Sequence, residues 1–317
     1  MKEIIIQKDD SGQRLDKFLQ KYFKQASKSF LYKMLRKKNI KLNNKKAEGK
    51  EMLQMGDQVS IYFSDETFEK FRGVQQKKFF YPTTKLSILY EDNNVVILNK
   101  PAGMLSQKAK NYDVTLVEYF LGYLQKSGKW SPGGSFTPGV CNRLDRNTSG
   151  IVIAGKSLAG LQKMSELLKE RRIDKYYKTI VQGVMRESSV IRGYLEKDEK
   201  TNKVSIYEQE GEGRSYIETG YEPLMDNGEY TLLRVKLITG KTHQIRSHLS
   251  SIGHPILGDV KYGGKKIQDG KGFFLHAESV FFPELDQPFA CLSGQIVQAP
   301  LPERFERMVY HLFGKRG

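Results

Sequence analysis

The spacing of apolar residues changes along the chain, and this change limits the possible folds more than any other feature. In residues 1–63, apolar side chains recur at the spacing of an amphipathic helix. They form two stripes, made of Leu15, Phe18, Leu19, Tyr22 and Phe23 and of Phe30, Leu31, Met34 and Leu35. From Leu86 onward, short apolar runs typical of strands predominate. We therefore expect an α+β fold, with a small N-terminal α/β module ahead of a larger domain that has more sheet than helix.

Polar turn residues divide the first segment into elements. Ser27 can cap the second helix. A short strand, Ile40–Leu42, is followed by the turn Asn43–Asn44, and asparagine tolerates the positive φ angle that such turns need. Gly56–Asp57 forms another turn ahead of a strand over Val59–Phe63. The sequence thus predicts a compact unit of two helices and a small sheet.

The positive charge of the chain is concentrated in the same segment. The chain has a formal net charge of +16, and residues 1–63 hold 15 Lys plus Arg against 7 Asp plus Glu, which is half of that charge. On the second predicted helix, five basic side chains are free to face outward: Lys28, Lys33, Arg36, Lys37 and Lys38. A protein this basic most often binds nucleic acid. The alternative is a solvated basic face that only keeps the chain soluble.

Three stretches of this segment resemble the S-four-type RNA-binding module, which is named after a small-subunit ribosomal protein. They are RLDKFL at Arg14–Leu19, SKSFLYKMLRKKNIKLN at Ser27–Asn43 and GDQVSIYF at Gly56–Phe63. A mild departure is the turn, where Leu-Asn-Asn stands in place of the usual Val-Asn-Gly. The resemblance implies that residues 1–63 bind RNA and that the basic residues of the second helix contribute to binding.

Other features exclude several classes of protein. The two cysteines, Cys141 and Cys291, are too few for a disulfide framework. No apolar stretch approaches the length of a membrane span, and the N-terminal residues MKEIIIQKDD contain no apolar signal core. We therefore expect a cytoplasmic protein that has no membrane segment.

Residues 64–85 are polar and charged, and we expect them to form a linker. The aromatic residues Phe79, Phe80 and Tyr81 within it could pack onto one of the domains. The larger domain then covers residues 86–317.

Local signals place the first elements of the larger domain. The predicted strands Leu86–Tyr90 and Val95–Leu98 flank a hairpin signal. Thr115 and Glu118 are spaced as a capping box, and Ser157 can cap a further helix. These signals indicate a mixed α/β arrangement.

One segment of the larger domain, GVCNRLDRNTSGIVIAGKS from Gly139 to Ser157, combines a polar turn with a buried strand. Its Arg-Leu-Asp triplet, which ends at Asp145, comes just before Thr-Ser-Gly and a β-branched run. A carboxylate held in a tight turn beside a fixed cation can stay ionised and act as a nucleophile or base. A lone Asp in a turn more often forms an Asx-turn or a helix cap, so the wider sequence has to decide between these roles.

This segment resembles the His-Arg-Leu-Asp…Thr-Ser-Gly signature of the RluA-type pseudouridine synthases, and Asp145 stands where that family has its catalytic aspartate. Further stretches resemble the family in the same order: LYEDNNVVILNKPAGMLSQ (Leu89–Gln107), DKYYKTIVQG (Asp174–Gly183), TGKTHQIRSHLSSIGHPILGD (Thr239–Asp259) and LHAESVFF (Leu275–Phe282). The resemblance implies a mixed, mostly antiparallel sheet flanked by helices. It also implies an active-site tyrosine at Tyr177 and an active-site arginine at Arg246.

The chain departs from the family pattern at several positions. Asn142 replaces the usual His, and Arg146–Asn147 replaces a pair that is usually more acidic. Gln107 stands where His is common, and Thr179 stands where Ala is usual. None of these changes affects the nucleophile, so they bear on the subgroup and on the target uridine.

The resemblance implies an enzyme that isomerises specific uridines to pseudouridine in RNA, most commonly in large-subunit ribosomal RNA. The isomerisation conserves all atoms, so we expect no cofactor. The implied enzyme is a monomer without an obligate protein partner. A rival from another class is a non-catalytic RNA-binding or ribosome-assembly factor that keeps the fold. Such a factor would be expected to lose Asp145, Tyr177 or Arg246, and all three residues are present.

Four histidines, His243, His248, His254 and His276, raise the question of a metal site. His243 and His248 are five residues apart and would not share a helix face, and no Cys or carboxylate completes a ligand set at a known spacing. We therefore predict no metal and expect His243 to be a structural hydrogen-bonding residue. A metal-dependent nuclease would need carboxylates clustered near Asp145, which the sequence does not show.

The sequence leaves alternatives open for three of the predicted site residues. Arg246 either pairs with Asp145 inside a partly dry site or is a surface residue of a helix. Tyr177 stacks on the uracil, lies near the departing proton, or is a core aromatic beside Tyr176. Arg143 either contacts the RNA around the flipped nucleotide or forms a structural salt bridge.

Overall fold

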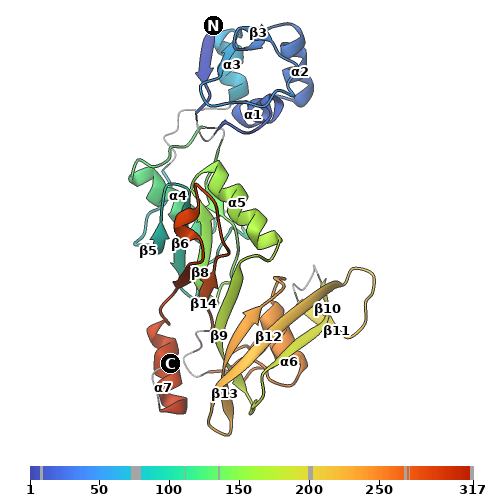
Figure 1. The fold of residues 1–317 in the computed structure, drawn as a ribbon, viewed down its shortest axis with the longest axis vertical. Helices are drawn as coiled ribbons and strands as arrows, with labels where there is room; N and C mark the ends of the chain where they lie inside the picture. Colours follow the sequence, from blue (N-terminus) through green and yellow to red (C-terminus); the bar gives the residue numbers. More distant parts are fainter. Residues whose placement is uncertain are drawn as a thin grey trace.

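Two β-sheets with their helices make up the part of the chain that the structure describes (Figure 1). The structure is a computed structural model, and it describes residues 1–7, 10–72, 80–110, 112–134, 136–198, 203–267, 270 and 272–314. A 4-stranded sheet belongs to the N-terminal module at one end of the molecule, and an 11-stranded sheet runs through the rest. The predicted α+β fold is confirmed.

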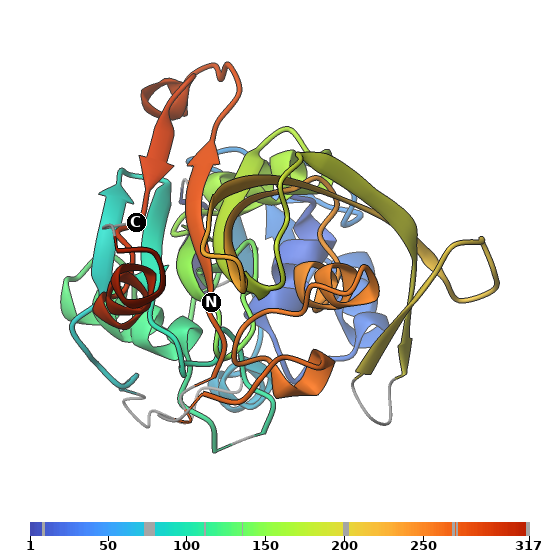
Figure 2. The same ribbon diagram turned by 90° about the horizontal axis from the view of Figure 1, so that it is seen from below.

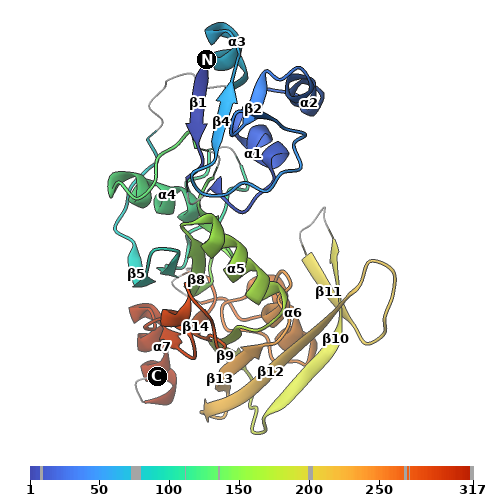
Figure 3. The same ribbon diagram turned by 45° about the horizontal axis from the view of Figure 1, so that its top comes forward.

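The N-terminal module is an antiparallel sheet in the order β1-β4-β2-β3 with helices packed against it (Figure 3). Its elements are β1 (Lys2–Ile5), α1 (Leu15–Tyr22), α2 (Lys28–Arg36), β2 (Ile40–Leu42), β3 (Lys45–Lys46) and β4 (Gln58–Ile61). The two apolar stripes of the sequence form its core. The predicted cap and turn are confirmed, because Ser27 Oγ accepts from Phe30 N at 3.2 Å and Asn43 and Asn44 have φ angles of 49° and 61°.

A further helix, α3 (Asp65–Arg72), lies in the interval that the sequence predicted to be a linker. Phe68 of this helix is buried in the core of the N-terminal module. At the other end of the interval, Tyr81 packs onto the larger domain, where its backbone N donates to Gln125 Oε1 at 3.1 Å. Phe79 lies outside the described residues. We therefore propose that the module extends through α3 instead of ending at residue 63.

The larger sheet has the order β11-β10-β12-β13-β9-β14-β8-β6-β5, with β15 paired to β14 and β7 paired to β8. Its strands are β5 (Ser87–Glu91), β6 (Val95–Lys100), β7 (Gly139–Val140), β8 (Ser149–Gly155), β9 (Asp174–Gln182), β10 (Ser189–Asp198), β11 (Lys203–Tyr207), β12 (Ser215–Asp226), β13 (Tyr230–Leu237), β14 (Leu275–Phe281) and β15 (Ile296–Gln298). Among these strands, the pair of β14 and β8 is parallel and the other pairs are antiparallel. The prediction of a mixed, mostly antiparallel sheet is thus confirmed.

Helices pack on this sheet at several places. They are α4 (Leu116–Lys126), α5 (Leu158–Lys169), α6 (Gln244–Ser251) and α7 (Glu303–Phe313), with short 3-10 turns at η2 (Val260–Tyr262) and η3 (Ala290–Leu292). In Figure 2, strands β10 to β13 curve round the side on which α6 lies. No helix within the described part of the chain combines the length and the apolar character needed to cross a membrane.

Both predicted helix starts of the larger domain are confirmed. At the start of α4, Thr115 N donates to the Glu118 carboxylate at 3.1 Å. At the start of α5, Ser157 Oγ accepts from Gly160 N at 3.0 Å. The predicted hairpin is also present, as the antiparallel pair of β5 and β6.

Strand β8 anchors the turn that precedes it. All of its residues are buried, and Gly150 lies opposite Ala277 of β14 in the parallel pair. Gly150 has a φ angle of +108°, and a Cβ added there would lie 2.1 Å from Ala277 O. Glycine therefore lets the two strands approach closely where the Thr-Ser-Gly segment ends the turn.

We expect Gly150→Ala to lower the free energy of unfolding by at least about 3 kcal/mol, because the new Cβ overlaps a carbonyl and the backbone disfavours any L side chain. Urea unfolding of the full chain measures the change. Gly134→Ala is the matched control, because an added Cβ there meets no described atom within 4 Å. Equal unfolding midpoints for the two variants would contradict the close approach of β8 and β14.

Candidate active site

Asp145 lies in the turn between β7 and β8, and hydrogen bonds to neighbouring segments hold this turn in place. Ser106 Oγ donates to Leu144 O at 2.8 Å and accepts from Leu144 N at 3.1 Å. Asn142, which replaces the family's usual His, bridges to β8, where its Oδ1 accepts from Ile153 N at 2.8 Å. These hydrogen bonds connect the turn to Ser106 and to the backbone of β8. They therefore hold the carboxylate of Asp145 at a defined place just before β8 begins.

Arg246 reaches Asp145 from α6. Its Nη1 donates to Asp145 Oδ2 at 2.8 Å, so the predicted contact is confirmed. The side chain of Arg246 is 7% exposed and that of Asp145 is 26% exposed. The guanidinium carbon lies 4.9 Å from the ring centre of Tyr262 and 4.3 Å from that of Phe273. The cation is thus buried among rings, and its partner Asp145 is the more exposed of the two.

A second carboxylate, which was not predicted from the sequence, holds the other side of Arg246. Asp259 Oδ2 accepts from Arg246 Nε at 2.7 Å, and Asp259 Oδ1 accepts from Nη2 at 2.9 Å. Burial alone would lower the pKa of Arg246, but Asp259 and Asp145 outweigh burial and raise it. Asp259 is the sole acidic residue of the stretch Thr239–Asp259. Because no other carboxylate lies in this stretch, the sequence could have identified Asp259 as a partner of Arg246.

Tyr177 lies on β9 and is 6% exposed. It stands opposite Val235 of β13 and Ala277 of β14. Burial, and to a lesser extent the charge of Asp145, raise the pKa of Tyr177 well above its usual range, so the phenol keeps its proton. Tyr177 is therefore a buried aromatic within electrostatic range of Asp145, and its predicted role stays a prediction.

Lys100 is a second buried cation that was not predicted. It ends β6 and is fully buried, and its Nζ donates to the carbonyl oxygens of Pro101, Met104 and Arg146 at 3.0, 2.7 and 3.2 Å. Burial lowers its pKa to about 7, and the charge of Asp145 opposes this effect. Because three carbonyl acceptors match the three donors of an ammonium group, the charged form fits this cradle. Lys100 thus ties the segment after β6 to the turn of Asp145.

His243 precedes α6 and contacts the same carboxylate. Its Nδ1 lies 2.8 Å from Tyr262 Oη, which confirms the predicted structural hydrogen bond. Its Nε2 lies 3.8 Å from Asp145 Oδ2, so it also belongs to the site, which was not predicted. Burial lowers the pKa of His243, and the charge of Arg246 acts in the same direction while that of Asp145 opposes it.

The other three histidines considered as metal ligands each form a hydrogen bond elsewhere in the fold. His248 Nδ1 lies 2.9 Å from Thr219 Oγ1, and His276 Nδ1 lies 2.8 Å from Ser149 Oγ. His254 Nδ1 lies 2.8 Å from a backbone carbonyl. Within the described ranges, no three His, Cys, Asp or Glu side chains gather as a metal site would require. The expectation that the chain needs no metal stays a prediction.

The predicted RNA-binding residues lie in two separate places. The basic side chains on and just after α2 are all exposed: Lys28, Lys33, Arg36, Lys37 and Lys38. They belong to the N-terminal module, at the opposite end of the molecule from β13 and α6 (Figure 1). Arg143 is exposed two residues before Asp145 and forms no ion pair with any described residue, and both of its predicted roles stay open.

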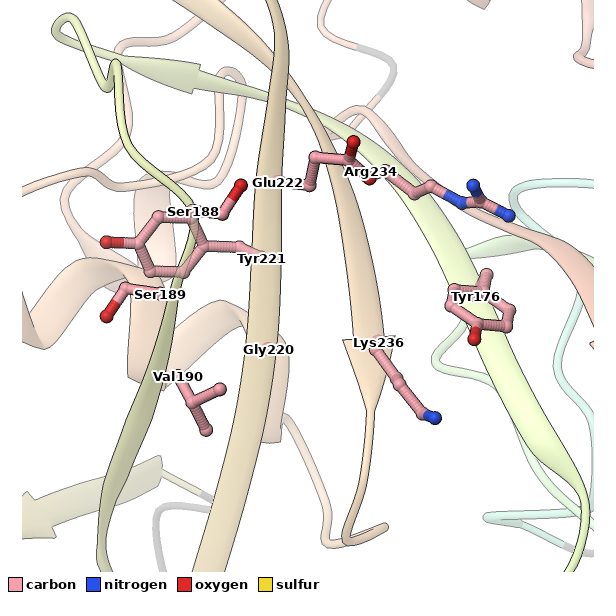
Figure 4. Close-up of a pocket in the computed structure, with 9 residues that line it drawn as sticks. All are labelled: Tyr176, Ser188, Ser189, Val190, Gly220, Tyr221, Glu222, Arg234 and Lys236. Carbon is pink, nitrogen blue, oxygen red and sulfur yellow. The ribbon is translucent and has the colours of Figure 1, made fainter.

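A hollow of about 310 Å³ lies on the other face of the sheet (Figure 4). Its lining includes Tyr176, Arg234 and Lys236. Because successive side chains of a strand point to opposite faces, Tyr176 faces this hollow while Tyr177 faces the core. The hollow is therefore separate from the site around Asp145.

Comparison with known families and structures matches both parts of the chain. A family model described as RNA pseudouridylate synthase matches residues 94–251, and an S4 domain model matches residues 13–59. Among solved structures, human RNA pseudouridylate synthase domain containing 4 superposes with a TM-score of 0.58 at 23% identity, over 71% of this chain and 92% of that one. The fold is that of a pseudouridine synthase, with an S4 domain at the N-terminal end.

Relatives align over nearly the whole chain. An RNA pseudouridine synthase of Mycoplasma capricolum, described as uncharacterized, is 33% identical over 94% of this chain and 97% of its own length. Ribosomal large subunit pseudouridine synthase C is 31% identical in Vibrio vulnificus, over 97% and 95%, and 28% identical in Escherichia coli K12, over 100% and 98%. The chain belongs to the RNA pseudouridine synthase family, and it is an RNA-modifying isomerase.

We expect Asp259→Asn to lower the free energy of unfolding by about 3 kcal/mol, because the buried guanidinium of Arg246 loses one of its two anions. Urea unfolding at neutral pH measures the loss. Glu229→Gln is the control, because its pair with Lys265 is exposed on both sides, at 62% and 60%. A change below about 1 kcal/mol is expected for the control. Equal losses would show that Asp259 does not stabilise the buried cation.

Proposed function

We propose that this enzyme converts specific uridines of large-subunit ribosomal RNA to pseudouridine and that Asp145 is its nucleophile. The observation that carries the proposal is the partly exposed carboxylate of Asp145, paired on one oxygen with the buried Arg246. Full-length relatives named ribosomal large subunit pseudouridine synthase C support large-subunit RNA as the substrate.

The reaction breaks the bond from the ribose to a ring nitrogen of uracil and rejoins the two through a ring carbon, which then loses its proton. A nucleophile has to engage the sugar or its neighbouring position while the base is detached and turns. Asp145 fits this role because Arg246 holds its Oδ2, whereas Oδ1 accepts no hydrogen bond from the described residues. Oδ1 is therefore the oxygen available to the nucleotide.

In this proposal Arg246 keeps the carboxylate of Asp145 ionised and fixes its orientation. A guanidinium next to a carboxylate favours the charged form of the carboxylate. Two hydrogen bonds from Asp259 hold the guanidinium, so its orientation does not depend on Asp145 or on the substrate. Pre-organised charge of this kind adds little reorganisation energy to the reaction.

Tyr177 has the role of a binding surface for the detached uracil in this proposal. Its raised pKa keeps the phenol protonated at neutral pH, which makes it a poor acceptor for the proton that leaves the ring carbon. Aromatic side chains bind unstacked bases through their ring faces. A ring in the core beside Asp145 would hold the uracil close to the sugar while it turns.

Recognition of the RNA is divided between the two parts of the chain in this proposal. The target uridine has to leave its stack, which costs a few kcal/mol unless it already lies in a loop. Arg143, exposed two residues before Asp145, is placed to bind the backbone around the flipped nucleotide. The basic residues of α2 would bind phosphates farther along the RNA and contribute affinity that carries little sequence information.

We also propose that the enzyme acts as a cytoplasmic monomer without cofactor or obligate protein partner. Asp145, Tyr177 and Arg246 come from one chain, and a ribosomal RNA substrate would be found in the cytoplasm. The alternative, a non-catalytic RNA-binding factor, is disfavoured by the intact contact between Asp145 and Arg246.

Asp145→Asn should abolish pseudouridine formation, with a loss of at least about a thousand-fold in the single-turnover rate, because the amide keeps the shape but removes the nucleophilic charge. RNA affinity should stay within about three-fold of the parent. Pseudouridine mapping of ribosomal RNA, in cells that lack the gene and are complemented with each variant, locates the site. Single-turnover conversion of an RNA that contains this site then measures the loss. Asp65→Asn, at a side chain that is 90% exposed, is the control. Substantial turnover by Asp145→Asn would rule out Asp145 as the nucleophile.

Replacing the five basic residues on and after α2 by Gln should weaken binding of a long structured RNA and flatten its salt dependence. The log–log slope should fall by about 0.7 to 0.9 for each phosphate contact that is lost. Binding across a salt series measures the slope. The charge-matched control replaces Lys126, Lys163, Lys169, Lys265 and Lys266, which lie on α4, on α5 and after η2. If both variants lose slope equally, the module does not dock RNA and its lysines form a solvated face.

A further inference from the structure

His243 adopts an uncommon backbone conformation directly before α6. Its φ and ψ angles are 55° and 14°, in the left-handed region that residues other than glycine rarely adopt. In this conformation His243 Nε2 lies 3.8 Å from Asp145 Oδ2, the same oxygen that accepts from Arg246 Nη1 at 2.8 Å. Conformations of this kind persist where the surrounding structure holds them, and they cluster at functional sites.

The hydrogen bonds of Tyr262 determine which ring nitrogen of His243 carries the proton. Tyr262 Oη accepts from Val204 N at 3.2 Å, and it lies 2.8 Å from His243 Nδ1. Within the described ranges, His243 Nδ1 is the one acceptor that the buried phenol can reach. When Tyr262 donates to Nδ1, a neutral His243 carries its proton on Nε2.

The surroundings of His243 favour this neutral form. Burial lowers its pKa, and the cations of Arg246 and Lys261 act in the same direction. The carboxylates of Asp145 and Asp259 act in the opposite direction without reversing the shift. At neutral pH, the ring thus presents an N–H group and not a basic nitrogen to the carboxylate.

We propose that His243 is a positioning residue: Tyr262 holds it as the Nε2–H tautomer, and this N–H keeps Oδ2 of Asp145 turned inward so that Oδ1 faces the ribose. The proposal rests on the proposed role of Asp145 as the nucleophile. The distance of 3.8 Å between His243 Nε2 and Asp145 Oδ2 is longer than a hydrogen bond. In this proposal it shortens when the nucleotide fills the site, because catalytic hydrogen bonds are often long in the free enzyme. His243 then has no free lone pair, so it cannot accept the proton that leaves the uracil ring.

The tautomer can be measured without RNA. The full chain is labelled with ¹⁵N-histidine, and long-range ¹H–¹⁵N correlation at pH 7.5 reports the protonation of each ring nitrogen. The signals of His243 are those that disappear in His243→Asn, among the 5 histidines of the chain. We expect the neutral Nε2–H form in the parent and a loss of this single form in Tyr262→Phe. A proton on Nδ1, or on both nitrogens, in the parent would overturn the proposal.

Kinetics then distinguish positioning from binding. Tyr262→Phe keeps the ring and removes the donor to Nδ1, so the single-turnover rate at saturating RNA should fall by about ten-fold to a hundred-fold. The Kd for RNA should change by less than about two-fold. Tyr310→Phe, which removes a phenol hydroxyl from a side chain that is 63% exposed on α7, is the matched control. An unchanged rate in Tyr262→Phe, or a change in Kd alone, would overturn the positioning role.

The two experiments separate this proposal from the proposed function. If the parent forms no pseudouridine in any RNA, the role of Asp145 as a nucleophile fails, and the proposal for His243 fails with it, even when the tautomer is as expected. If the parent is active and His243 carries its proton on Nδ1, the proposed function stands and the positioning role fails.

Discussion

The buried guanidinium of Arg246 between two carboxylates is the interaction on which the rest of the site depends. Burying a cation costs several kcal/mol unless anions and hydrogen bonds compensate it. Asp259, which is 2% exposed, accepts two of these hydrogen bonds inside the fold, and the more exposed Asp145 accepts one. Because Asp259 can neutralise the cation without help, a substrate can engage Asp145 without leaving an uncompensated buried charge at Arg246.

The sheet brings these residues together from distant parts of the chain. Asp145 and Arg246 are 101 residues apart, and they meet because β14 pairs in parallel with β8 and in antiparallel with β9. Gly150 permits the close contact of β8 with β14, and the bonds of Ser106 and Lys100 hold the turn beside it. The position of Asp145 is thus a property of strand register and turn anchoring.

The features that could be predicted from the sequence are those that depend on residues close together in the chain. Helix caps, turns and apolar stripes depend on near neighbours, so the cap at Ser27 and the hairpin of β5 and β6 were predicted correctly. The contact of Asp145 with Arg246 came from a family resemblance, because no local pattern shows that residues this far apart meet. Asp259 and Lys100 were missed since only the tertiary fold sets the partners of a buried charge. Helix α3 was missed because a polar segment with one buried anchor, Phe68, has the composition of a linker.

The division of charge between the two parts of the chain suits a reaction in which the base must leave its stack. Around Asp145 the cation of Arg246 is neutralised by carboxylates, so Arg246 itself has little charge to spare for phosphates. Residues 1–63 carry half of the net charge of +16 and expose five of their basic side chains on and after α2, away from the turn of Asp145. Binding energy from a remote contact can offset the cost of unstacking the target uridine. The site is then free to hold one geometry, because it does not also have to supply the affinity for RNA.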